Sequence, residues 1–320
     1  MIENKSWDLI LKEEQIEIKK YPRLDIPIAC PISGFAIFKV SGNDRYTFLQ
    51  NQFTNDLMEE KVCQLSAWCN PKGKVIANFI IINTGEFYLL FFKENLKDYL
   101  LKKLYMYILR SDVIIQDVSS IYLQLGLSNI DKLELFYENS SLKDGKVKFI
   151  DKSYITKLPD YSGRHLIVSQ IESIKDIIHK LKDSINFVDY LNWEKQDILS
   201  KIPWIDFENK EKYLPQIINL DKLNAISYKK GCYSGQEVIA KVHYRGKIKR
   251  NMVLISSKNE LTPGSYLYEK SSDKKVGDIL NTSTKKSDNN FFSLAIIESE
   301  KLNTDLFDNT NRRHKINVIE

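Results

Sequence analysis

The residue types best suited to chemistry gather in one short segment of the chain, from Lys230 to Gly246. This segment contains Cys232 between Gly231 and Gly235, and it holds three of the twelve glycines in the sequence. Glycine adopts positive φ and allows close backbone approach at little steric cost. The spacing therefore predicts a tight turn that presents the thiol of Cys232.

Positive charge surrounds this thiol. Seven Lys or Arg residues and a single acid, Glu237, lie between Lys229 and Arg250. Because nearby cations stabilise a thiolate and lower its pKa, we predict that Cys232 is a reactive thiol and that Lys230 activates it. The alternative is that Cys232 is a buried, inert side chain beside a solvated basic strand. The residues by themselves leave both interpretations open.

A second candidate lies on a helix that the sequence predicts over residues 188–200. Leu191, Ile198 and Leu199 fall on one stripe at helical spacing, whereas Trp193 points away from that stripe. A large aromatic ring off the core face meets a ligand, another domain or water. Trp193 is therefore a candidate for stacking on a planar heterocycle, with packing at a domain interface as the alternative.

The elements around these candidates indicate an α+β body followed by an all-β tail. Apolar strands and amphipathic helices follow one another before residue 200, and five short strands after Arg250 predict a small barrel. The expected body strands are 35–40, 65–69, 75–82, 87–92, 113–117, 122–127, 147–150 and 166–168, with helices ending at residue 50 and spanning 96–108 and 171–182; the tail strands are near 252–255, 266–268, 275–280, 292–297 and 315–319.

Size and composition limit the class of protein. The chain has 320 residues, 43% apolar and 28% charged, which is typical of a globular protein with two or three domains. A net charge of +5 is too small to indicate nucleic-acid binding by itself. The four cysteines include no Cys-x-x-Cys pair, and the apolar runs are strand-sized. We expect a protein of the reducing cytoplasm, without disulfides, structural zinc or a membrane segment.

The segment around the thiol resembles a known signature. Lys-Gly-Cys-Tyr-Ser-Gly-Gln-Glu at 230–237, with Ala-Lys at 240–241 and Tyr-Arg-Gly at 244–246, is similar to the motif of the YgfZ family, the folate-binding relatives of the glycine-cleavage aminomethyltransferase. The resemblance covers residues 30–250 clearly and the tail loosely. It extends to Gln-Phe-Thr-Asn-Asp at 52–56, Cys-Asn-Pro-Lys-Gly-Lys at 69–74 and Leu-Pro-Gln at 214–216.

This resemblance implies an aminomethyltransferase-like α+β fold. Its ferredoxin-like α/β body is in two parts around a central funnel, and a small C-terminal β-barrel follows. We expect the parts to be 1–118, 119–249 and 250–320. The family also implies tetrahydrofolate or another folate as ligand, with Phe35 and Trp193 as the two aromatic contacts. Phe35 stands where the family usually has tryptophan, so this position keeps an aromatic face but loses an N–H donor.

The resemblance further implies an accessory protein that supports assembly or repair of iron-sulfur enzymes, including those that thiomethylate tRNA. Its partners would be folate and iron-sulfur enzymes or cluster carriers, with an indirect link to tRNA and no membrane, and we expect a monomer. A transient cluster at Cys232 would need further ligands, because one thiolate cannot hold a cluster, and no metal site is assigned. The residues expected to support the motif are Gly231, Tyr233, Gly235, Gln236, Glu237 and Arg245.

Two enzymatic alternatives remain, although the sequence favours a non-catalytic role. A folate-dependent aminomethyltransferase needs an acid where this chain has Ala77 and Asn78, and an amide cannot take a proton at neutral pH. A cysteine hydrolase would pair Cys232 with a histidine. The four histidines available to a hydrolase are His165, His179, His243 and His314.

Glu237 is expected to form a salt bridge with Lys230, Lys241 or Arg245.

Overall fold

The chain forms two compact units, each built from separate stretches of sequence. The computed structural model describes residues 5–19, 27–57, 62–130, 142–160, 162–270, 272–284, 289–308 and 315–319. Within these ranges no helix is both long and apolar enough to cross a lipid bilayer. The first unit comprises Met1–Leu49, Leu57–Leu65 and Phe79–Trp193, and the second comprises Gln50–Asp56, Ser66–Asn78 and Glu194–Glu320.

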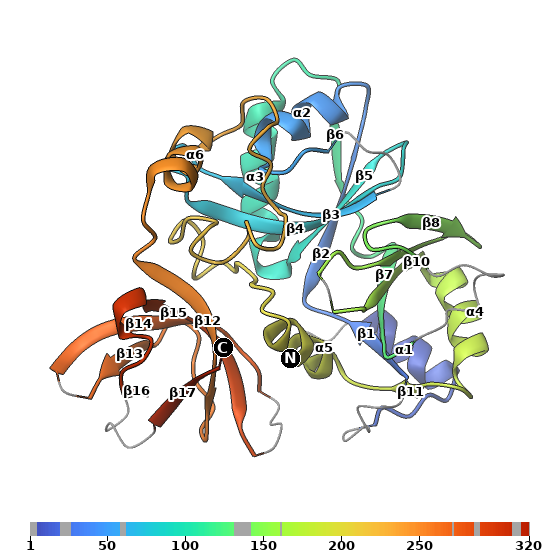
Figure 1. Ribbon diagram of the computed structural model, residues 1–320. Helices are drawn as coiled ribbons and strands as arrows, with labels where there is room; N and C mark the ends of the chain where they lie inside the picture. Colours follow the sequence, from blue (N-terminus) through green and yellow to red (C-terminus); the bar gives the residue numbers. More distant parts are fainter. Residues whose placement is uncertain are drawn as a thin grey trace. The chain divides into compact units, whose positions relative to one another are not determined.

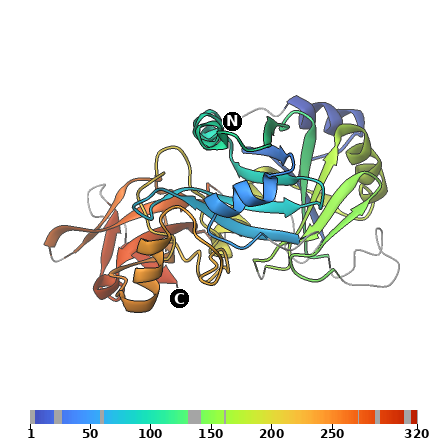
Figure 2. The same ribbon diagram turned by 90° about the horizontal axis from the view of Figure 1, so that it is seen from above.

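The first unit contains a six-stranded sheet with two helices, α1 (Lys5–Glu13) and α4 (Ile171–Leu181), packed against it. Figure 2 shows these helices side by side. Ile174, Ile177 and Ile178 of α4 are buried in one core with Trp7 of α1, which confirms the helix predicted from their spacing. In spatial order the strands are β11 (Asn186–Phe187), β1 (Ile28–Ile32), β7 (Tyr122–Ser128), β10 (His165–Gln170), β9 (Ser153–Lys157) and β8 (Val147–Ile150).

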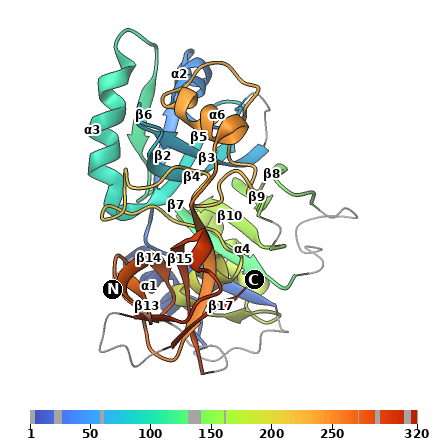
Figure 3. The same ribbon diagram turned by 60° about the vertical axis from the view of Figure 1, so that its left-hand side comes forward.

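A five-stranded sheet with two further helices, α2 (Arg45–Gln52) and α3 (Lys97–Ile108), accounts for the strands and the amphipathic helix predicted before residue 118. Figure 3 shows α3 running beside the edge of this sheet, where Tyr105 donates a hydrogen bond of 3.0 Å to the carbonyl of Ile115. In spatial order the strands are β3 (Val62–Cys69), β4 (Val75–Asn83), β5 (Tyr88–Lys93), β2 (Phe35–Ser41) and β6 (Ile114–Asp117).

The second unit ends in a closed six-stranded barrel, drawn in orange to red in Figure 1. The C-terminal barrel predicted from the sequence is thus confirmed. The strand that the pattern missed, β16, has only three residues, too few to display an alternation. The strands are β12 (Arg250–Ser257), β13 (Tyr266–Glu269), β14 (Ser272–Thr282), β15 (Phe291–Glu298), β16 (Leu306–Asp308) and β17 (Lys315–Ile319).

The basic stretch after the thiol is a helix, α6 (Gln236–Arg245), so the solvated basic strand considered in the alternative for Cys232 is wrong. Val238, Ala240 and Val242 alternate with other residues, which imitates a strand. Gly235 has a φ of 81° and precedes the first turn of α6, so the chain enters a helix directly from the glycine. Ile239 is buried while Lys241 is exposed, as expected for a one-sided helix.

The helix α5 (Tyr190–Leu199) departs from the prediction in part. Ile198 is buried as predicted, but Trp193 is only 3% exposed, whereas Leu191 and Leu199 are 37% and 39% exposed. Hydrophobic patterning failed because the buried face includes polar residues that are satisfied by hydrogen bonds. Asp197, for example, is buried and accepts a hydrogen bond of 2.9 Å from the indole nitrogen of Trp204.

His165 is expected to make the protein sensitive to mild acid. It is buried at the start of β10, and burial lowers its pKa to about 4. An unfolded histidine titrates near 6.5, so between pH 6.5 and 4 the unfolded chain binds a proton that the folded chain does not. The free energy of unfolding should therefore fall by about 2 to 3 kcal/mol as the pH drops through this window. The substitution His165→Phe should remove this fall in the free energy of unfolding. Denaturant titrations of the variant across the same pH window would measure it.

The exposed His179 provides the matched control, because its side chain is 69% accessible. His179→Gln should leave the acid response unchanged. An identical pH profile for the wild-type protein and His165→Phe would show that His165 is not the group responsible.

Candidate functional site

Lys230 anchors the segment that carries the predicted thiol. Its side chain is buried, and its Nζ donates hydrogen bonds to the carbonyls of Gln50, Phe53 and Asn55 at 2.7, 2.7 and 2.8 Å. Burial lowers the pKa of Lys230 to about 8. The three acceptors are satisfied only by the ammonium form, because a neutral amine has two hydrogens. Lys230 therefore fastens this segment to the motif at 52–56.

The motif at 69–74 also packs against this segment, and glycines allow the close approach. A Cβ atom on Gly235 would lie 2.5 Å from the carbonyl oxygen of Asn70 and 2.8 Å from the Cα of Gly73. A Cβ on Gly73 would lie 3.1 Å from the Cβ of Val238 on α6. Gly73 and Gly235 both have positive φ, so these positions require glycine for conformation as well as for space.

Side-chain amides and a tyrosine complete the support. Gln216 donates a hydrogen bond of 2.8 Å to the carbonyl of Ile239 in α6, so the motif at 214–216 contacts the helix that follows the thiol segment. Gln236 reaches the carbonyl of Lys230 at 3.4 Å. Tyr233 is buried, burial raises the pKa of its hydroxyl, and Lys230 Nζ lies 5.3 Å from its ring centroid. Two motifs that are far away in sequence, 52–56 and 69–74, thus contact residues 230–235, the thiol loop, and the motif at 214–216 contacts the helix that follows it.

Cys232 is exposed on the thiol loop, which excludes the buried alternative for this residue. The other three cysteines are buried, and burial raises the pKa of Cys63 to about 12 and that of Cys69 further. Among the free thiols, Cys232 is therefore the accessible one. Glu237 is exposed and forms no ion pair within the described residues, so the expected salt bridge is not made.

The histidines show no pairing with the thiol. Within the described ranges no side chain is hydrogen-bonded to Cys232 Sγ. His243 instead stacks on Tyr228 with ring centroids 3.8 Å apart. His165 and His179 belong to the first unit, and His314 lies outside the described residues.

Phe35 belongs to an aromatic cluster in the first unit. Its ring meets Tyr190 edge-on, with centroids 6.4 Å apart. Lys93 Nζ lies 4.8 Å from the centroid of Phe35 and donates a hydrogen bond of 2.8 Å to the hydroxyl of Tyr190. Trp193 follows Tyr190 by three residues on α5, so it lies about one helical turn away. Phe35, Lys93 and Tyr190 are in contact, and Trp193 lies on the same helix as Tyr190; these four residues are called the aromatic cluster.

Trp193 is packed tightly inside the first unit. A Cβ atom on Gly126 of β7 would lie 2.2 Å from its ring. The guanidinium carbon of Arg164 lies 4.3 Å from the ring centroid, and Arg164 pairs with the buried Asp160 at 2.8 Å. Within the described residues no acceptor meets the indole N–H of Trp193. Most of the ring is therefore covered, while its polar hydrogen stays available.

Sequence reasoning missed Lys93 as a member of the aromatic cluster and Arg164 as the cover of Trp193. Tyr190 could have been found from the sequence, because it lies three residues before Trp193 on the same predicted helix. Lys93 ends β5 opposite Phe35 in the β2–β5 register, and this partnership exists only once the strands are paired. Arg164 comes from a loop before β10, and nothing in its local sequence points to Trp193.

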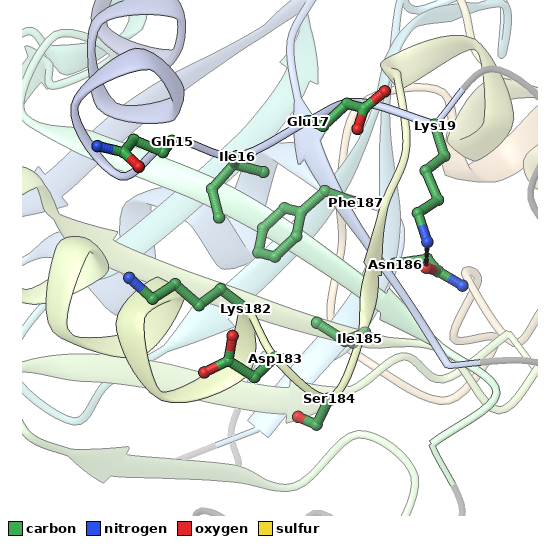
Figure 4. Close-up of a pocket in the computed structure, with 10 residues that line it drawn as sticks. All are labelled: Gln15, Ile16, Glu17, Lys19, Lys182, Asp183, Ser184, Ile185, Asn186 and Phe187. Atoms are coloured by element: carbon green, nitrogen blue, oxygen red, sulfur yellow. Dashed lines mark hydrogen bonds between the residues drawn. The ribbon is translucent and has the colours of Figure 1, made fainter.

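A separate cavity of about 460 Å³ opens beside β11 in the first unit (Figure 4). Ile16 and Phe187 supply apolar surface, and Lys19 donates a hydrogen bond to Asn186 at one side. None of the residues that the sequence singled out is among the described residues that line it. The cavity is therefore distinct from both candidate sites.

The fold has a relative of known structure. The glycine cleavage system aminomethyltransferase T from Bartonella henselae is similar with a TM-score of 0.72, covering 97% of this chain and 88% of that chain at 12% identity. At this identity the likeness concerns the fold alone, and it confirms the predicted aminomethyltransferase-like architecture. A scan against protein-family models finds no match.

Curated relatives cover most of the chain. The tRNA-modifying protein YgfZ of Buchnera aphidicola subsp. Schizaphis graminum is 32% identical over 274 residues, which is 81% of this chain and 84% of the relative. The tRNA-modifying protein YgfZ of Yersinia pestis strain Pestoides F is 30% identical over 239 residues, 73% of this chain and 72% of the relative. With the motifs converging on the thiol loop, these similarities agree with the resemblance found in the sequence, and the chain belongs to the YgfZ family.

Proposed function

We propose that the protein is a cytoplasmic, folate-binding accessory factor that supports assembly or repair of iron-sulfur enzymes, including those that thiomethylate tRNA. The observation that carries the proposal is the thiol loop. Buried Lys230 binds the motif at 52–56 and Gly235 packs against the motif at 69–74, and together they hold a loop whose thiol is exposed. Such extensive support for one accessible thiol is expected where the thiol does chemistry. Membership of a family whose curated relatives are named tRNA-modifying proteins supports the link to tRNA.

The aromatic cluster suits a folate. A pterin is flat and a folate carries an anionic glutamate tail, so aromatic rings and a cation match its two ends. Phe35 and Tyr190 supply rings, and Lys93 supplies the cation beside them. Because most of Trp193 is covered, we propose that it contributes its indole N–H to a ligand acceptor rather than an open stacking face. Folate binding at these residues is the part of the proposal that rests on the family resemblance.

An iron-sulfur cluster would be cargo rather than a resident group. Among the described residues no three His, Cys, Asp or Glu side chains are grouped to hold a metal. Cys232 would therefore supply one thiolate, and the client enzyme or a cluster carrier would supply the other ligands. An exposed thiol on a loop that Lys230 anchors is suited to such a shared, transient contact.

The aminomethyltransferase alternative is less well supported by the residues present. The amide of Asn78 is buried, and both of its ends are engaged. Its nitrogen donates to the carbonyl of Pro203 at 2.8 Å, and its oxygen accepts from the backbone N–H of Ile205 at 2.8 Å. Asn78 therefore serves to hold the chain at 203–205, and it brings no acid to the position where transferase chemistry needs one.

The proposal predicts that Cys232→Ala abolishes the protein's support of tRNA thiomethylation. A bacterium lacking its own family member would be complemented with the wild-type or variant protein, and methylthio-modified nucleosides would be quantified by mass spectrometry. We expect the wild type to restore modification and Cys232→Ala to lose at least about tenfold, since removing a nucleophile removes its chemistry.

Ser234→Ala is the matched control, because it removes a small polar group from the same loop and should restore modification fully. Equal restoration by the wild type and Cys232→Ala would reduce the thiol to a structural role. Failure of a well-expressed wild-type protein would contradict the proposed function as a whole.

A further inference from the structure

A second surface of the second unit lies at the C-terminal end of α6. Three rings meet there: Tyr228 and His243 stack at 3.8 Å with planes 17° apart, and Tyr244 meets His243 edge-on at 4.7 Å. Tyr244 also lies edge-on to Tyr228 at 6.2 Å. Although two rings hold it, Tyr244 is 67% exposed. The surface thus presents an aromatic ring that is both fixed in position and open to solvent.

Exposed cations lie near this ring in the sequence. Lys241, Tyr244 and Arg245 share one face of α6, because residues three and four apart on a helix are neighbours. Within the described residues none of these cations pairs with an acid. The one acid on α6, Glu237, lies about two turns before Tyr244. The exposed cations on α6 and in the segments beside Tyr228 and after α6 are Lys229, Lys241, Arg245, Lys247 and Lys249, and with Tyr244 they are called the α6 surface.

The combination selects a particular class of ligand. Unpaired cations attract a phosphate backbone, and an exposed ring provides a platform on which an unpaired base stacks. Double-stranded RNA hides its base faces and would use the charge alone. An acidic protein surface would likewise interact with the cations, but it would offer no flat group to stack on the ring of Tyr244. Single-stranded RNA is the ligand that uses both features.

We propose that the α6 surface binds a single-stranded segment of RNA directly, with a base stacked on Tyr244 and phosphates near Lys241, Arg245 and Lys247. The indirect link to tRNA expected from the family would then be joined by a direct contact. This inference is independent of the roles proposed for Cys232 and for folate, because it uses none of their residues except Arg245 of the motif.

Fluorescence anisotropy with a labelled single-stranded RNA of about 12 nucleotides, within the span that such sites cover, tests the proposal. A duplex of the same sequence serves as the comparison ligand. Tyr244→Ala should weaken single-strand binding about tenfold, whereas Tyr244→Phe, which keeps the ring, should bind like the wild type. Lys241→Gln combined with Lys247→Gln should lower the slope of log affinity against log salt by roughly 1.4, since each phosphate contact contributes about 0.7.

Matched controls separate a specific surface from general attraction of a polyanion. Tyr266→Ala removes a partly exposed ring from the barrel, and Lys102→Gln removes an exposed cation from α3, so neither should change binding. Cys232→Ala should also bind RNA normally, which distinguishes this proposal from the proposed function. Unchanged affinity in Tyr244→Ala would overturn the proposal. So would duplex binding as tight as single-strand binding, or binding of polyglutamate in place of RNA.

Discussion

Replacing Lys230 with methionine is expected to lower the free energy of unfolding by about 3 kcal/mol or more. The substitution keeps most of the side-chain volume but leaves the carbonyls of Gln50, Phe53 and Asn55 without their donor. Each buried acceptor left unsatisfied costs about 1 to 3 kcal/mol. Denaturant unfolding would measure the loss, and the tRNA assay should show reduced support, because the thiol loop loses its anchor.

The adjacent Lys229 offers a matched control, since it is exposed whereas Lys230 is buried. Lys229→Met should change stability by less than about 0.5 kcal/mol, as is usual for surface positions. Equal effects of the two substitutions would show that the three carbonyl contacts of Lys230 contribute little to the fold.

Alanine at Gly126 should be nearly as damaging, with an expected loss of about 3 kcal/mol in stability. The added methyl group would lie 2.2 Å from Cζ3 of Trp193, far inside contact distance, and the ring cannot move freely because Arg164 covers it. Displacing Trp193 should also weaken binding of tetrahydrofolate if the aromatic cluster holds it. Thermal unfolding and calorimetric titration with tetrahydrofolate measure the two effects separately.

Gly231 is the control for this substitution, because a Cβ there meets nothing within 4 Å. Gly231→Ala should leave stability nearly unchanged. Combining Gly126→Ala with Trp193→Leu should recover part of the lost stability, since the smaller side chain makes room for the methyl group. A Gly126→Ala protein as stable as the wild type would mean that Trp193 relocates without cost.

Local features of the chain were predictable from the sequence. The spacing of Ile174, Ile177 and Ile178 determines which face of α4 is buried, and the short strands after Arg250 close into the barrel. The helix and the individual strands each show their own periodicity, so these elements could be predicted from it. The glycine pattern predicted a tight turn at Cys232, but it left open whether the thiol is exposed, which the structure decides.

Features that depend on long-range contacts were not predictable. The acceptors of Lys230 are backbone oxygens, and a carbonyl has no sequence signature. Trp193 is buried because Gly126 leaves space for its ring and Arg164 covers it, and both come from other parts of the chain. A predicted activator of the thiol thus proved to have all three of its donors committed to the backbone, a role that residue type alone did not indicate.

The anchoring of Lys230 has a consequence for the synthesis of the chain. Asn55 precedes Lys230 by 175 residues, and synthesis proceeds at about 5 to 20 residues per second. The ribosome therefore finishes the segment around Asn55 roughly 9 to 35 s before its lysine emerges. During that interval the carbonyls of Gln50, Phe53 and Asn55 form without the lysine that later binds them. The second unit can be completed only after its C-terminal half has been made, whereas the sheet of the first unit has all its strands once residue 187 has emerged.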